Sequence, residues 1–203
     1  MKNTQQLPKG YRPFRIIDYK RNNSLSVKIN FLAIGVCSLL YILTFRMAPM
    51  FGASAQGLDQ ISVPFIVIGA ILYFPLHELI HGLAMVLLCR KPVPKFRADG
   101  ILAYAGSMAY YSRSSYLLIS FAPIVVWGVV LAVLPLLLGS GMYWSASLSQ
   151  ILNLAGAVGD IYVAVAMLRM PSDTLVQDIG VVRVFLSASD RVTPLPTKKE
   201  QTQ

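Results

Sequence analysis

Four long apolar segments dominate the sequence. They extend over residues 27–45, 61–89, 115–138 and 145–168, and polar stretches separate them. A helix needs about 20 apolar residues to cross the roughly 30 Å hydrocarbon layer of a bilayer. Each segment is long enough, so we predict a mainly α, polytopic membrane protein with four transmembrane helices.

The segments divide the chain into three predicted parts. Residues 1–26 form a polar lead, residues 27–170 form the four-helix transmembrane domain, and residues 171–203 form a polar tail. Composition agrees with this division, because 55% of the residues are hydrophobic and 13% are charged, whereas about a quarter of a soluble domain is charged. The first apolar run exceeds the roughly 7–15 residues of a signal-peptide core, so we expect a retained anchor.

Basic residues alternate with the apolar segments. The chain has a formal net charge of +9, and its lysines and arginines lie mainly before the first segment, between the second and third, and after the fourth. The positive-inside rule therefore predicts that both termini are cytoplasmic. Nucleic-acid binding is not expected, since that function needs clustered basic residues with base-reading chemistry.

Two polar regions have sequences typical of β-structure. The tyrosine-bearing stretch from Ile101 to Tyr111 predicts a strand or hairpin at the cytoplasmic side, although tyrosines also serve as interfacial anchors in membrane proteins. In the tail, β-branched residues surround a turn at Asp178-Ile179-Gly180 within residues 174–186. They predict a second small hairpin.

A metal-binding motif, His77-Glu78-Leu79-Ile80-His81, lies in the second apolar segment. Residues four apart share one helical face, so both imidazoles can bind one metal ion. Glu78 projects about 100° around the helix, where it would take a proton from a water that zinc has acidified. Ionisable groups within a span are costly and are retained mainly for function. We therefore favour a metal site over a purely structural polar cluster.

A zinc site usually has a third protein ligand in addition to two histidines. Apart from the motif glutamate, Asp160 is the one carboxylate within an apolar segment. His81 precedes Arg90 by nine residues and Asp160 precedes Arg169 by nine, so both lie about 13 Å below the same boundary. The sequence thus predicts His77, His81 and Asp160 as the zinc ligands.

Asn153 lies seven residues before Asp160, with Gly156 and Gly159 between them. On a continuous helix Asn153 would share the face of Asp160, where it would either bind the backbone of a substrate or form an interhelical hydrogen bond. The glycines are typical of helices that approach each other closely.

In three elements the chain resembles the putative zincin peptidases, small bacterial membrane proteins placed near the site-2 intramembrane metalloproteases. The elements are His77-Glu78-Leu79-Ile80-His81-Gly82, Phe121-Ala122-Pro123, and Asn153 through Gly159-Asp160. The resemblance implies zinc held by two histidines and a later carboxylate, with the motif glutamate as base, in a bacterial cytoplasmic membrane. Site-2 proteases carry an Asp-Gly pattern at that carboxylate, whereas Ile161 follows Asp160 here.

These features predict a membrane-embedded zinc metalloprotease that hydrolyses peptide bonds of membrane-associated proteins or peptides, with Glu78 as general base. The alternative is a non-catalytic zinc-binding membrane protein, either a protease-like chaperone or a metal carrier. Haem binding is disfavoured because two histidines one turn apart cannot ligate opposite faces of the ring. The sequence predicts neither the identity of the substrate nor an oligomeric state.

Overall fold

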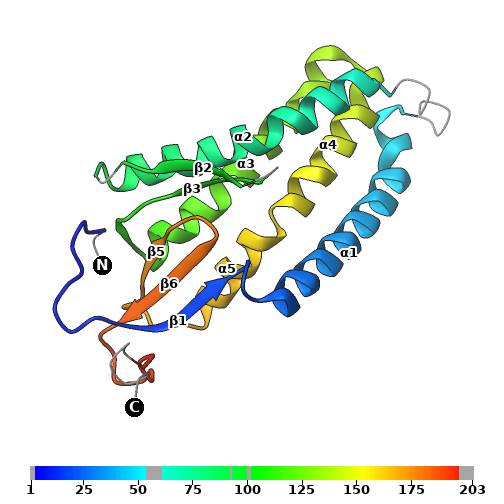
Figure 1. Cartoon of the computed structure of the whole chain (residues 1–203). Helices are drawn as coiled ribbons and strands as arrows, with labels where there is room; N and C mark the ends of the chain where they lie inside the picture. Colours follow the sequence, from blue (N-terminus) through cyan, green and yellow to red (C-terminus); the bar gives the residue numbers. More distant parts are fainter. Residues whose placement is uncertain (1–2, 54–60, 92, 100–101, 197–203) are drawn as a thin grey trace.

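Five α-helices form most of the part of the chain that the computed structural model describes, which is residues 3–53, 61–91, 93–99 and 102–196 (Figure 1). They are α1 (Asn23–Met47), α2 (Val63–Leu88), α3 (Arg113–Leu138), α4 (Tyr143–Gly156) and α5 (Val158–Leu168), with short 3-10 turns at Ala48–Phe51 and Ser140–Met142. Within the described residues, three helices are long and apolar enough to cross a membrane, and the bent pair α4 and α5 gives a fourth if it counts as one span. The prediction of a mainly α, multi-pass membrane protein is confirmed.

The fourth predicted segment is divided. We expected one helix over residues 145–168, but α4 and α5 meet at Ala157 with a bend of 47°. The bend turns α5 away from the axis of α4, so residues on its two sides do not share the face that a continuous helix would give them.

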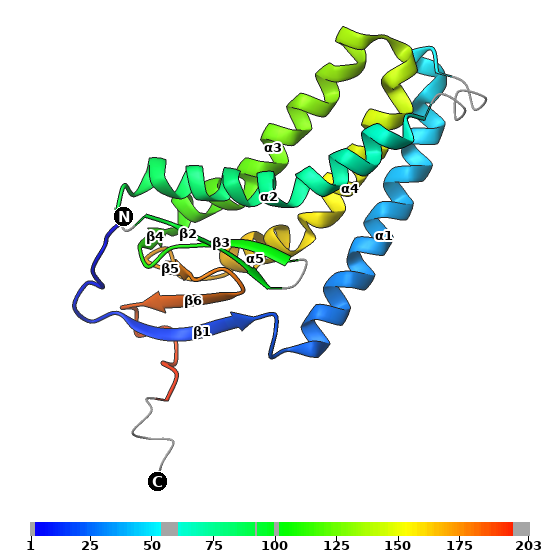
Figure 2. The same cartoon turned by 45° about the horizontal axis from the view of Figure 1, so that its top comes forward.

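Two antiparallel sheets lie at one end of the helices. The larger has the order β1-β6-β5-β4, and the smaller pairs β2 with β3. Figure 2 shows β3 beside α2. The strands are β1 (Arg12–Asp18), β2 (Lys95–Asp99), β3 (Leu102–Gly106), β4 (Tyr110–Ser112), β5 (Leu175–Asp178) and β6 (Val182–Ser187).

The sheets agree with the predicted small β element and extend it. The tail hairpin is confirmed as β5 and β6. The other hairpin begins earlier than expected, at Lys95, and Ile101 lies outside the described residues. Sequence patterns had not predicted β1, which joins the polar lead to the tail by pairing with β6.

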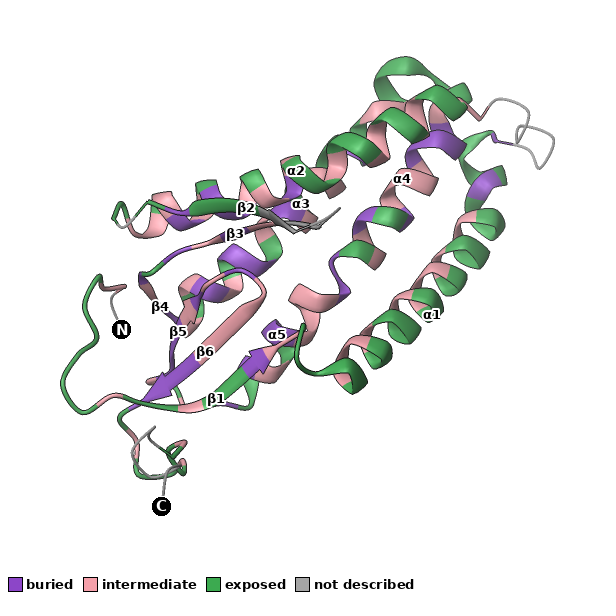
Figure 3. Cartoon of the chain, viewed as in Figure 1, coloured by how far each residue is buried: buried purple, intermediate pink, exposed green. Residues whose placement is uncertain are grey.

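Buried residues lie on α2 to α5 and on the larger sheet (Figure 3). No residue of α1 is buried, as expected for a helix whose apolar side chains face lipid. A continuous buried cluster instead joins the sheet to the nearby ends of the helices. It includes Ile17, Met85, Tyr116, Met167 and Phe185. This packing fixes the position of the sheet relative to the polar residues of α2 and α5.

Candidate metal centre

Helix α2 presents His77 and His81 on one face, one turn apart. Their ring centroids are 4.8 Å apart, and each residue is 6% exposed. The ring of Tyr73, one turn before His77, lies 5.1 Å from the His77 ring. Helical spacing and packing thus hold both imidazoles together in a buried position.

The orientation of His81 follows from a proline in α3. Its Nδ1 lies 2.9 Å from the carbonyl oxygen of Ile119, and since a carbonyl can only accept, Nδ1–H is the donor. This carbonyl lacks a helical donor because Pro123, four residues later in α3, has no backbone N–H. With Nδ1 as the donor, the neutral form of His81 would present the lone pair of Nε2. Such a second-nitrogen bond is the usual way in which a metal-binding histidine is oriented.

Asp160 lies opposite both histidines, in the first turn of α5. Its Oδ2 is 3.4 Å from Nε2 of His77 and 3.4 Å from Nε2 of His81. Zinc bonds of 2.0–2.2 Å in a tetrahedron separate two ligand atoms by about 3.3–3.6 Å, whereas N–H···O hydrogen bonds are mostly about 2.7–3.2 Å long. The distance from Oδ2 to each Nε2 therefore fits ligand atoms that share one small cation.

Glu78 is a second carboxylate beside the histidines. A carboxylate oxygen of Glu78 and a ring nitrogen of each histidine all lie within 4.8 Å of one another. Its Oε2 also accepts the backbone N–H of Ala105 in β3, at 2.6 Å. Oδ2 of Asp160 and a carboxylate oxygen of Glu78 are thus both close enough to the imidazoles to share a metal ion with them, and Glu78 is in addition held by β3.

Arg183 of β6 is a residue of this cluster that the sequence patterns did not single out. Its Nη2 lies 3.1 Å from Oδ1 of Asp160, and its Nε lies 3.3 Å from Oδ2 of Asp178. The sequence grouped Arg183 with the basic residues that set membrane orientation. Its position within the apolar run Val181-Val182-Arg183-Val184 was the signal that it is partly buried and paired.

The charges of the cluster also favour a divalent cation. Three carboxylates, those of Glu78, Asp160 and Asp178, are accompanied by the single guanidinium of Arg183. Carboxylates therefore outnumber guanidinium groups in a region of low exposure, where a bound cation would supply compensating positive charge. The buried Nδ1 of His77 also has no hydrogen-bond partner among the described residues. Two imidazoles and a carboxylate are the donor set of many zinc sites.

Asn153 lies apart from the predicted ligands, in hydrogen bonds between helices. Its Oδ1 accepts from the hydroxyl of Tyr73 at 3.3 Å, and its Nδ2 donates to the carbonyl of Ile124 at 3.4 Å. It is fully buried. The interhelical bond, one of the two roles expected from the sequence, is therefore present. Asn153 contacts Tyr73, and the ring of Tyr73 lies beside that of His77.

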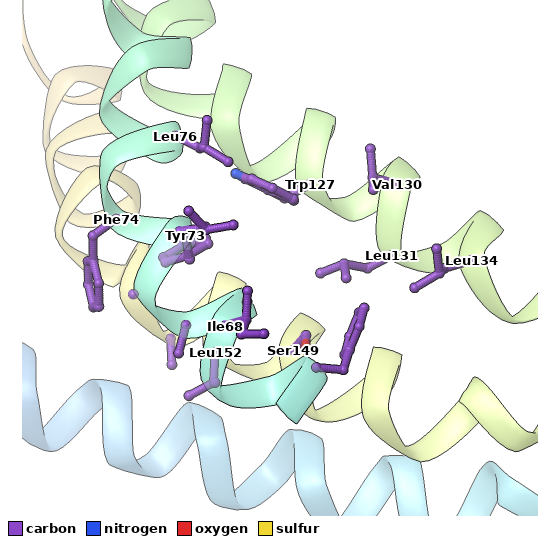
Figure 4. A pocket seen from close by; sticks show the side chains of 16 residues that line it. Ile68, Tyr73, Phe74, Leu76, Trp127, Val130, Leu131, Leu134, Ser149 and Leu152 are labelled. Atoms are coloured by element: carbon purple, nitrogen blue, oxygen red, sulfur yellow. The ribbon is translucent and has the colours of Figure 1, made fainter. Parts of the chain in front are cut away.

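Tyr73 also borders a cavity of about 500 Å³ between α2, α3 and α4. Figure 4 shows that Trp127, Leu131 and Leu152 line this space with Tyr73. The lining is almost entirely apolar and contains residues that precede His77 along α2. The histidines are not among its lining residues, so the cavity lies next to the candidate site, beyond Tyr73, along the N-terminal half of α2.

A family model matches about half of the chain. The family model described as putative zincin peptidase matches residues 70–175, a range that contains the two histidines, Glu78 and Asp160 but not Arg183. No curated protein and no solved structure matches the chain.

Proposed function

This chain belongs to the putative zincin peptidase family, and from that premise we propose that it is a membrane-embedded zinc metalloprotease acting on membrane-associated proteins or peptides. One observation carries the proposal. Oδ2 of Asp160 lies 3.4 Å from Nε2 of both histidines, and Glu78 lies beside them. This is the arrangement that metal-assisted hydrolysis requires: ligands on one side and a base next to them.

In the proposed reaction His77, His81 and Asp160 would hold the zinc ion. When bound, zinc acidifies a water molecule and polarises the carbonyl of the scissile peptide. Glu78 accepts the proton of that water as the water attacks, and delivers it to the departing amine. Because Oε2 of Glu78 accepts the Ala105 N–H, Oε1 is the oxygen that carries the proton.

The edge of β3 is the proposed site for the substrate backbone. The N–H of Ala105 points to Glu78 and therefore away from the partner strand β2. A peptide that adds to this edge in extended form would bring its carbonyls next to Glu78. Extension is necessary, since an intact transmembrane helix hides its carbonyls in its own hydrogen bonds.

The apolar cavity beside Tyr73 supports a substrate that lies in the membrane. An apolar segment continuing from the scissile peptide away from β3 would enter the space between α2, α3 and α4. Its apolar side chains would pack against this lining, and its backbone would remain helical there, because the lining offers almost no polar partner.

The proposed location is a bacterial cytoplasmic membrane with both termini in the cytoplasm. β1 precedes α1 and β6 follows α5, and the two strands pair. An even number of crossings satisfies this pairing, so we count α4 and α5 together as the fourth span. The basic residues near the sheet favour the cytoplasmic side for that end.

The decisive experiment combines metal analysis with a cleavage assay. The protein is purified in detergent, its zinc content is measured, and a set of membrane-anchored peptides is offered. Glu78→Gln keeps an oxygen that can accept the Ala105 N–H, so it should retain zinc and lose activity by about 10²–10⁴-fold, the usual contribution of a general base. The exposed Asp190 provides a control in Asp190→Asn.

Each outcome bears on a different part of the proposal. A wild-type protein that binds no zinc would overturn it. Zinc binding with equal cleavage in Glu78→Gln would remove the glutamate from its role. Zinc binding without cleavage of any membrane-anchored peptide would favour the non-catalytic chaperone or metal carrier.

A further inference from the structure

Arg183 connects the four-stranded sheet to the candidate metal centre. It lies in β6, where it pairs in register with Ile17 of β1 and Asp178 of β5. Its side chain is 12% exposed, and that of Asp160 is 13% exposed. An arginine with so little contact with water needs partners for its charge. The hydrogen-bond partners of Arg183 therefore determine its effect on the candidate metal centre.

The contact with Asp160 separates the roles of the two carboxylate oxygens. Nη2 of Arg183 donates to Oδ1 at 3.1 Å, while Oδ2 is the oxygen that faces both histidines. A carboxylate whose Oδ1 is already bound offers one oxygen to a metal ion. Arg183 thus favours one-oxygen ligation by Asp160 and fixes the direction in which that oxygen points.

Arg183 itself is held from three sides. Its Nε donates to the hydroxyl of Tyr116 at 2.8 Å and to Oδ2 of Asp178 at 3.3 Å. Tyr116 in turn hydrogen-bonds the same carboxylate. The ring of Tyr19 lies under the guanidinium, whose central carbon is 5.3 Å from the ring centroid. The guanidinium therefore has one well-defined position from which to act on Asp160.

Both ends of the chain contribute to this arrangement. Tyr19 follows β1, and its hydroxyl donates to the carbonyl of Gly159, the residue before Asp160, at 3.0 Å. Tyr19 and Arg183 both lie outside residues 70–175, the part that matches the family model. The sheet therefore supplies contacts to Asp160 that the matched segment does not contain.

We propose that Arg183 is a positioning residue for the metal centre, which orients Asp160 so that Oδ2 meets the metal ion together with Nε2 of His77 and His81. This inference rests on the proposed zinc site. Orientation and simple electrostatics predict opposite effects of removing Arg183 on zinc affinity. A positive charge near a cation site repels the cation, so removal of Arg183 by charge alone would strengthen zinc binding. Loss of orientation weakens it.

The test measures metal binding by the full-length protein in detergent. Zinc affinity is determined by competition with a chelator for wild type, Arg183→Gln, Arg183→Lys and the control Arg15→Gln, which removes an exposed arginine from β1. Arg183→Gln should weaken zinc binding by about 10–100-fold, the usual effect of losing a partner behind a metal ligand. Arg183→Lys should show a smaller loss, because an ammonium cannot hold both carboxylates in the fork geometry of arginine.

The visible absorption of the cobalt-substituted protein supplies a readout that a merely structural role would not move. Its bands should shift in Arg183→Gln as Asp160 changes its mode of ligation, and stay unchanged in Arg15→Gln. Wild-type or tighter zinc affinity with unchanged cobalt bands would overturn the inference. If Arg183→Gln does not fold, the same result in Arg183→Lys overturns it. A wild-type protein that binds neither metal would instead remove the proposed function.

Discussion

Replacement of Asp160 by asparagine tests the metal site with the smallest change of shape. Asp160→Asn keeps an oxygen that can accept from Nη2 of Arg183, which now lies at 3.1 Å from Oδ1. It removes the negative charge 3.4 Å from both imidazoles. We therefore expect a folded protein that has lost a zinc ligand.

The expected magnitude has two parts. Without metal, Arg183 loses one of the two carboxylates that compensate its buried charge and keeps that of Asp178 at 3.3 Å, so the free energy of unfolding should fall by about 1.5–3 kcal/mol. With metal, the loss of a direct ligand should weaken zinc binding by at least about 100-fold, which is the upper value for losing a residue that only supports a ligand. That factor corresponds to about 2.7 kcal/mol at equal free zinc, or about 5–11 °C in melting temperature for a chain of this size.

The assay is thermal unfolding in detergent at several buffered zinc concentrations, with zinc stoichiometry measured in parallel. Asp173→Asn is the matched control, since Asp173 accepts from Ser187 Oγ at 2.8 Å and from Ala188 N at 2.9 Å. That variant should lose the same stability with and without zinc. The reasoning is refuted if Asp160→Asn is stabilised by zinc as strongly as the wild type is.

Three further variants test other features of the structure. Gly69→Leu places a side chain in open space at the cavity wall. The rate of cleavage of membrane-anchored substrates should fall about tenfold, or roughly 1.4 kcal/mol, while cleavage of short soluble peptides is unaffected. Gly35→Leu on α1 is the control. Pro123→Ala supplies a helical donor that competes for the Ile119 carbonyl, and zinc affinity should fall by about tenfold in the chelator assay. Burial raises the pKa of Tyr111 from 10.0 to about 12. The neutral phenol therefore contributes stability that is fully present below pH 10 and is lost as the pH rises from 10 to about 12. In alkaline unfolding, Tyr111→Phe should therefore lose less stability than wild type between those pH values.

The helical part of the fold was predictable because its signals are local. The length of an apolar run and the basic residues beside it define a span without reference to the rest of the chain. The pairing of β1 with β6 was not predictable in this way, since it joins Arg12 to Ser187 across most of the sequence. The hairpin formed by β5 and β6 was predicted, because its strands and turn are adjacent.

The candidate site was predictable where residues lie on regular helices. The spacing of His77 and His81 and the equal depth of Asp160 are consequences of helix geometry. Arg183 was missed because basic residues that follow the last span are usually explained by the positive-inside rule. Its contact with Asp160 depends on the fold of the tail against α5, which no local pattern contains.

The break in the fourth span explains why the chain ends matter to the site. The hydroxyl of Tyr73 donates to the Asn153 carbonyl before the break at 3.1 Å, while Tyr19 donates to the Gly159 carbonyl after the break at 3.0 Å. Because α5 starts anew at Val158, Asp160 lies in a first turn, where the helix dipole favours a carboxylate. A straight helix would offer Asp160 no such position. The lead, through Tyr19, thus stabilises the geometry on which the proposed metal site depends.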